Sequence, residues 1–135
     1  MNEKILVIED DPATSRLVDY ALRHEGYQVT TAANGLAGMR KVQEEKPDLL
    51  ILDVMLPGMD GFEVCHRLRS EPDTASVLIL MFSAKAQEID KNTGLKVGAD
   101  DYLPKPAAPA EIVRRVAVLL EKKSSARQAG EKVRG

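Results

Sequence analysis

The fold of this chain is decided by the stretch Leu49–Gly61, which reads LLILDVMLPGMDG. Its first four residues are apolar, which is typical of a short strand buried on both faces of a sheet. The run ends on the carboxylate of Asp53, and Pro57 and Gly58 then impose a loop. Because open α/β sheets bind ligands at the carboxyl ends of their strands, Asp53 is a candidate site residue. The alternative is that Asp53 only caps the loop or the next helix.

The bulk properties describe an ordinary globular chain. Its 135 residues are 44% hydrophobic and 30% charged, and they fit one domain. The formal net charge of −2 gives no whole-domain electrostatic case for binding nucleic acid. The single cysteine, Cys65, fits a reducing compartment, and the apolar run 5–8 is too short for a signal peptide. We therefore expect a cytoplasmic protein.

Strand and helix patterns alternate five times along the chain. Strands are expected at 4–8, 27–31, 49–52, 77–82 and 102–103, and helices at 12–25, 35–45, 62–70, 87–97 and from 109 to about 120. This alternation predicts an α/β fold with a doubly wound, five-stranded parallel sheet of order 2-1-3-4-5, a flavodoxin-like three-layer sandwich. We expect the folded domain to span residues 1–121. Residues 122–135 have almost nothing to bury and are predicted to form a basic, disordered tail or linker.

Polar side chains follow four of the predicted strands. Glu9 and Asp10 follow the first strand, Asp53 the third, Ser83 the fourth and Lys105 the fifth. Because the carboxyl ends of parallel strands share one edge, these groups should converge. Crowded carboxylates need a cation, and oxygen ligands of this kind suit Mg²⁺.

A carboxylate beside a divalent ion can also act as a nucleophile in phosphoryl transfer. Lys105 would then meet one phosphoryl oxygen as a point charge, and Ser83 would donate a hydrogen bond to another. In the structural alternative, Lys105 only pairs with Asp53, Ser83 only ends a strand, and the acids only cap a helix.

These residues resemble the receiver domain of bacterial two-component response regulators. The resemblance runs from Lys4 to about Leu120. It is carried by the motifs ILVIEDD at 5–11, LDVMLPGMDG at 52–61, FSA at 82–84 and GADDYLPKP at 98–106. The family resemblance implies that Asp53 accepts a phosphoryl group from a phosphohistidine of a sensor histidine kinase or phosphotransfer protein.

The resemblance also implies roles for the surrounding residues. Glu9, Asp10 and Asp53 would hold Mg²⁺ with the backbone carbonyl of Met55, and Glu9 would do so directly or through a water molecule. Ser83 would be the switch hydroxyl. Tyr102 would be the switch aromatic, turning inward as Ser83 moves toward the phosphoryl group. The face formed by the fourth helix, fifth strand and fifth helix would then control a partner or an output domain.

Two finer expectations follow from the resemblance. Receiver domains tune the lifetime of the aspartyl phosphate through two positions that correspond here to Met55 and Lys85. Neither side chain is suited to orient an attacking water, so we expect slow self-dephosphorylation and no catalysis on an outside substrate. Charged positions that one class of response regulators uses to form a symmetric dimer are matched here by Lys91, Asp101, Glu111 and Arg115. An ordinary charged surface is the alternative.

One position departs from the family pattern. Ala107 stands where an aromatic residue is common, and with Ala108 it makes a poor N-cap for the last helix. This departure bears on packing near the switch.

Three other functions compete with this interpretation. A Mg²⁺-dependent phosphotransferase or phosphatase would need a second acid two residues beyond the nucleophile, where this chain has Met55. A flavin-binding electron carrier would need a hydroxyl- or glycine-rich phosphate loop after the first strand, where the chain has three acids, residues 9–11. A receiver-like domain that is never phosphorylated and only binds a partner is the remaining alternative.

Overall fold

The sheet is built around the strand that the opening stretch predicts. The computed structural model describes residues 3–84 and 98–134, with side chains as far as residue 124. All its strand pairs are parallel, and the strand order is β2-β1-β3-β4-β5, as predicted. The strands are β1 (Lys4–Ile8), β2 (Gln28–Ala32), β3 (Leu49–Leu52), β4 (Leu78–Ser83) and β5 (Asp101–Pro104). All four residues of β3 are buried, because both faces of this central strand are covered.

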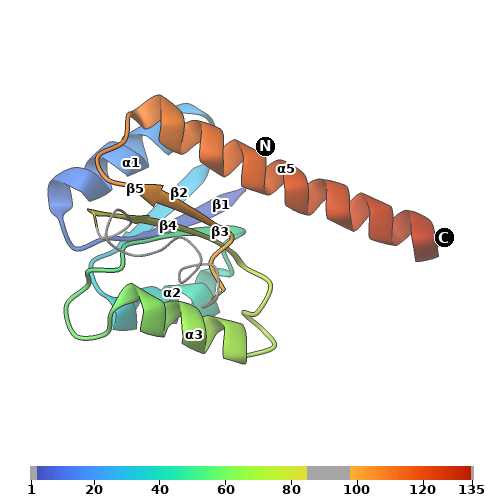
Figure 1. Cartoon of the computed structure of the whole chain (residues 1–135), viewed down its shortest axis with the longest axis horizontal. Coiled ribbons are helices and arrows are strands. Elements are labelled where there is room, and N and C mark those ends of the chain that lie inside the picture. The colour runs from blue at the N-terminus through green and yellow to red at the C-terminus, as the bar shows by residue number, and fades with distance from the viewer. Residues whose placement is uncertain (1–2, 85–97, 135) are drawn as a thin grey trace.

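Helices cover both faces of the sheet (Figure 1). They are α1 (Pro12–His24), α2 (Gly35–Glu45), α3 (Gly61–Ser70) and α5 (Pro109–Arg134). Leu50 and Leu52 pack in the core under α2 and α3, whereas Leu49 and Ile51 pack in the core under α1 and α5. This division follows from the pleat, because successive side chains of a strand point to opposite faces. The predicted helix at 87–97, with Lys85 and Lys91, lies outside the described residues.

Side-chain caps begin three of the helices. Asp11 accepts a hydrogen bond from the Thr14 N–H at 3.2 Å, and Pro12 occupies the first turn of α1, as predicted. Asn34 caps α2 through the Ala37 N–H at 2.8 Å, and Asp60 caps α3 through the Glu63 N–H at 2.9 Å. These bonds satisfy amide groups that have no partner within the helix, so they set where each helix begins.

The last helix is longer than the sequence predicted. Its apolar stripe of Ile112, Val116 and Leu119 is buried, but the helix continues to Arg134 rather than ending near Leu120. Figure 1 shows the extension projecting beyond the other elements. The expectation of disorder from residue 122 was therefore wrong for the described part. Residues 121–134 are mostly strong helix formers with no proline, so helix propensity continues the helix where burial ends. The proposed domain boundary at residue 121 stays a prediction.

Backbone hydrogen bonds extend the sheet by one residue at its carboxyl edge. The Glu9 N–H donates to the Ala32 carbonyl at 3.0 Å, the Asp53 N–H to the Ile8 carbonyl at 3.1 Å, and the Lys105 N–H to the Ser83 carbonyl at 3.1 Å. These bonds hold the residues that follow β1, β3 and β5 at one edge. Within the described ranges, no helix combines the length and the apolar character that a membrane span requires.

Candidate functional site

Asp53 lies at the carboxyl end of β3, and only 6% of its surface is exposed. Its Oδ1 accepts a hydrogen bond from the Met55 N–H at 3.0 Å. Its Oδ2 accepts one from Lys105 Nζ at 3.1 Å. Both carboxylate oxygens are therefore oriented by neighbours, one by its own loop and the other by the loop after β5.

Glu9 lies beside Asp53 and is equally buried. Its Oε2 accepts a hydrogen bond from the Asp11 N–H at 3.1 Å, and its Oε1 accepts one from Lys105 Nζ. The ammonium of Lys105 therefore bridges the two buried carboxylates, although Glu9 and Lys105 are 96 positions apart. The alternative from the sequence, that Lys105 only pairs with Asp53, describes one of its two contacts. The peptide bond between Lys105 and Pro106 is cis.

The pKa values of Glu9 and Lys105 both depart from their ordinary values. Burial raises the pKa of Glu9 above its ordinary value, although the hydrogen bonds from Lys105 and the Asp11 amide act against that shift. Burial alone would lower the pKa of Lys105, but its hydrogen bonds to Glu9 and Asp53 reverse this effect and raise it. Lys105 therefore stays a cation at neutral pH and offsets the negative charge of the cluster.

The acids at this edge fit a magnesium ion. Glu9, Asp10 and Asp53 can each present one carboxylate oxygen such that all three oxygens lie within 4.8 Å of one another. Glu9 and Asp53 are buried, whereas Asp10 is exposed. Mg²⁺ prefers a few carboxylate oxygens and keeps several waters, so one exposed ligand suits it. The donor set that the sequence predicted is therefore brought together, while the role of the Met55 carbonyl stays a prediction.

The two predicted switch residues lie on neighbouring strands. Ser83 ends β4 and is fully buried. Leu52 of β3 is aligned with Met81 of β4, and Ser83 lies two residues further along β4. It is therefore beside the loop that follows β3, residues 53–60, which we call the Asp53 loop. Tyr102 on β5 is 5% exposed, and its hydroxyl is buried without a hydrogen-bond partner among the described residues. Tyr102 is therefore packed in the core, and its role as the switch aromatic stays a prediction.

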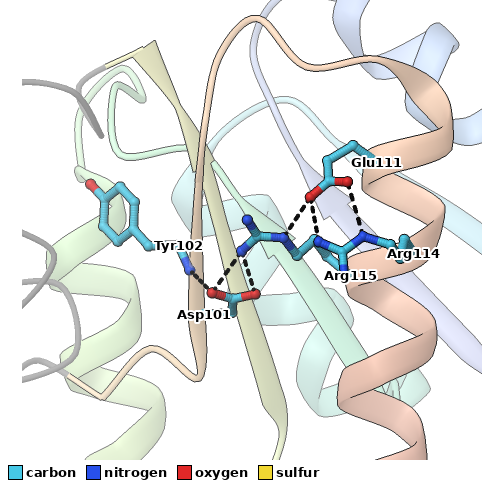
Figure 2. Close-up of polar contacts among 5 residues, drawn as sticks. All are labelled: Asp101, Tyr102, Glu111, Arg114 and Arg115. Carbon is cyan, nitrogen blue, oxygen red and sulfur yellow. Dashed lines mark hydrogen bonds and ion pairs between the residues drawn. The ribbon is translucent and has the colours of Figure 1, made fainter.

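Three of the predicted dimer-face residues are paired within the chain (Figure 2). Arg115 on α5 binds both carboxylate oxygens of Asp101 on β5, at 2.9 and 3.1 Å. Arg115 also binds Glu111 at 2.8 Å. Lys91, the fourth residue of that set, lies outside the described residues. The sequence predicted pairs between two molecules, and it did not foresee these pairs within one.

Two site residues were missed by sequence reasoning. A Cβ at Gly61 would lie 2.3 Å from the Asp53 carbonyl oxygen, so α3 reaches the Asp53 loop only through a glycine. The Lys105 ammonium lies 5.4 Å from the centre of the Phe82 ring, within the range of a cation–π contact. The glycine after the capping Asp60 could have suggested the first contact, but no sequence signal marked the second.

Comparisons with known proteins agree with this geometry. The family model for the response regulator receiver domain matches residues 5–117. The chain is 45% identical over 131 residues to the alkaline phosphatase synthesis transcriptional regulatory protein PhoP of Bacillus subtilis strain 168. That match covers 97% of this chain and 54% of the relative. The chain therefore spans about half the length of the curated relatives that it matches.

Solved structures show the same fold. A putative response regulator from Chloroflexus aurantiacus J-10-fl matches with a TM-score of 0.84 and 38% identity, over 90% of this chain and 99% of that one. The receiver domain of sensor histidine kinase PA1611 from Pseudomonas aeruginosa PAO1 matches with a TM-score of 0.77 and 32% identity, over 84% and 93% of the two chains. Its structure has a magnesium ion coordinated in the active-site cleft.

Proposed function

Because this chain belongs to the response regulator receiver family of two-component signalling, we propose that Asp53 is its phosphoacceptor. The observation that carries the proposal is the buried Asp53 carboxylate, which contacts Lys105 and lies beside Glu9 and Asp10 at the carboxyl edge of the sheet. The phosphoryl donor is the phosphohistidine of a sensor kinase or phosphotransfer protein. In the reaction the phosphorus–nitrogen bond of the donor breaks while a bond forms between phosphorus and an oxygen of Asp53.

Each neighbour of Asp53 has a proposed role in this transfer. Lys105 neutralises negative charge next to the acceptor, as its contacts with two carboxylates support. Glu9, Asp10, Asp53 and the Met55 carbonyl are the proposed ligands of Mg²⁺, which supplies charge neutralisation for a transferring phosphoryl group. Burial of Glu9 and Asp53 excludes water, which strengthens these electrostatic interactions.

The switch is the proposed consequence of phosphorylation. A phosphoryl group adds charge and strong acceptor oxygens, which attract the Ser83 hydroxyl. Movement of Ser83 stabilises the buried position of the Tyr102 ring relative to an outward one, and Tyr102 is 5% exposed in this structure. The proposed readout is the face formed by the fourth helix, β5 and α5, which would control a partner or an output domain.

The chain acts as a signalling module and not on an outside substrate. We propose that its own chemistry is limited to accepting the phosphoryl group and losing it slowly. The Met55 side chain is 53% exposed beside the acceptor loop, and a thioether cannot act as a base toward an attacking water. Met55→Gln, which offers an amide, should shorten the lifetime of the aspartyl phosphate. An unchanged lifetime in this variant would refute the role of Met55.

Two further proposals concern the oligomeric state and the cellular location of the protein. Phosphorylation promotes a homodimer through the charged β5–α5 face, because an isologous interface can pair acids and bases reciprocally. A monomer at high concentration with a stable phosphoryl mimic bound would contradict this. The cytoplasmic location that the sequence predicted stays a proposal.

The decisive experiment measures intact mass after incubation with a small-molecule phosphodonor, with and without Mg²⁺. The wild-type protein should gain one phosphoryl group only with Mg²⁺, and Asp53→Asn should gain none. Asp60→Asn is the matched control, because it makes the same change in the same loop and asparagine also caps helices well. No addition to the wild type would favour the alternative of a domain that only binds a partner.

A further inference from the structure

The β5–α5 face carries a compact network of charges within one chain (Figure 2). It contains two acids and two bases: Asp101, Glu111, Arg114 and Arg115. Arg115 bridges Asp101 and Glu111 and thereby ties β5 to α5. Asp101 is further held by a hydrogen bond from the Tyr102 N–H at 2.8 Å.

Arg114 is the part of this network that the sequence analysis did not assign. Its Nη2 contacts Oε1 of Glu111 at 2.7 Å, and its Nε contacts Oε2 at 3.0 Å. This is a bidentate pair, the strongest arrangement of an arginine with a carboxylate. Because Arg115 also binds Oε1, both oxygens of Glu111 are occupied by arginines of the same helix. A basic group of a second molecule would have to displace one of them.

We infer that Arg114 holds Glu111 in an intrachain clip that weakens self-association through the β5–α5 face. The inference rests on the proposed homodimer. In that dimer Glu111 pairs with a basic group of the second molecule, and Arg114 competes with that group for Glu111. Arg115 differs from Arg114, because it anchors both acids of the face and orients them. Removal of Arg114 should therefore free Glu111, whereas removal of Arg115 should disorganise the face.

The exposure of these side chains agrees with this division. Arg114 is 60% exposed, so its removal disturbs little packing, while Arg115 and Asp101 are much less exposed, at 27% and 20%. A surface ion pair changes an equilibrium by about twofold to fivefold. A symmetric dimer contains two copies of the clip. Arg114→Ala should therefore tighten dimerisation by about fourfold to twenty-five-fold.

The experiment is sedimentation equilibrium of the full chain with beryllofluoride and Mg²⁺, a stable mimic of the phosphoryl group. Arg114→Ala should lower the dimer dissociation constant, and Arg115→Ala should raise it. Arg67→Ala is the matched control: this arginine forms an exposed ion pair with Glu63 on α3, away from the face. It removes the same charge and measures the effect of a more negative chain, which by itself opposes association.

A carboxyl NMR titration tests the clip without reference to the dimer. Hydrogen bonds from Arg114 and Arg115 lower the pKa of Glu111 to about 2, and Arg114→Ala should raise it toward the ordinary range. The inference is overturned if Arg114→Ala associates as strongly as the wild type or more weakly. It is also overturned if both proteins stay monomeric with beryllofluoride and Mg²⁺. Intact mass after phosphodonor treatment decides separately whether Asp53 accepts a phosphoryl group, so failure of the clip and failure of the proposed function remain distinct.

Discussion

Gly61→Ala should impair phosphoryl acceptance without removing any polar group of the site. Gly61 begins α3, and its amide donates to the Val54 carbonyl at 2.9 Å. An added Cβ would lie 2.3 Å from the Asp53 carbonyl oxygen and 2.8 Å from the Val54 Cα. Both neighbours are backbone atoms, so no side-chain rotation can relieve the overlap.

The size of the effect follows from the displacement that this overlap demands. Ordinary contacts of a Cβ begin at 3.4 Å, so the first turn of α3 and the Asp53 loop must separate by about 1 Å. A misplacement of this size can slow an oriented reaction about 100-fold. Overpacking should also lower the free energy of unfolding by about 1–3 kcal/mol.

Gly38→Ala is the matched control for this prediction. Its Cβ would also meet an atom at 2.3 Å, but the overlaps are with side-chain atoms of Ile8, Cδ1 at 2.3 Å and Cγ1 at 2.7 Å, which side-chain rotation can move. Replacement of a helical glycine by alanine contributes about 1 kcal/mol of helix propensity, which offsets the repacking. Gly38→Ala should therefore accept the phosphoryl group at nearly the wild-type rate.

The assay is a time course of intact mass with a small-molecule phosphodonor at saturating Mg²⁺. Circular dichroism and the urea midpoint first establish that each variant is folded under the assay conditions. A folded Gly61→Ala that reacts at the wild-type rate would refute the argument that close backbone packing positions Asp53.

Three further predictions concern stability. Arg69, whose side chain is 21% exposed, donates to the carbonyls of residues 75, 77 and 98 and to the carboxylate of residue 100, so Arg69→Ala should lower the free energy of unfolding by about 2–4 kcal/mol. Arg67→Ala should change it by less than about 0.5 kcal/mol, and equal urea midpoints for the two variants would contradict the Arg69 clamp. Asn34→Ala removes the cap of α2 and should cost about 1 kcal/mol in urea unfolding, while Asn34→Asp should retain most of that stability. Burial raises the pKa of the Cys65 thiol from an ordinary value of 9.0 to about 11, so the folded state holds this proton more tightly than the unfolded state. The stability that depends on this proton is present below pH 9 and is lost as the pH rises to 11. Between these pH values, the free energy of unfolding should fall less in Cys65→Ala than in the wild type. An equal fall in both proteins would refute the assignment to Cys65.

Sequence reasoning predicted most of the fold because its signals are local. The apolar run 49–52 marks a buried strand by itself, and Asp11 with Pro12 marks the start of α1. The strand order came from a general preference of alternating strands and helices, and the structure confirmed it. The end of α5 was misjudged, because burial was taken as the condition for a helix where propensity alone continues it to Arg134.

The sequence by itself determined which chemical groups lie at one edge of the sheet, since the chain order of strands and the polar residue after each strand are both local facts. Only the tertiary structure decided how these groups meet. Lys105 reaches Glu9 as well as Asp53, α3 touches the Asp53 loop through Gly61, and Arg114 competes for Glu111. The Lys105 contacts join segments that are far apart in the sequence. The Gly61 contact depends on backbone packing that is close to within about 1 Å. The third depends on two neighbouring arginines, Arg114 and Arg115, both reaching the carboxylate of Glu111, and that is settled by side-chain geometry on the folded surface.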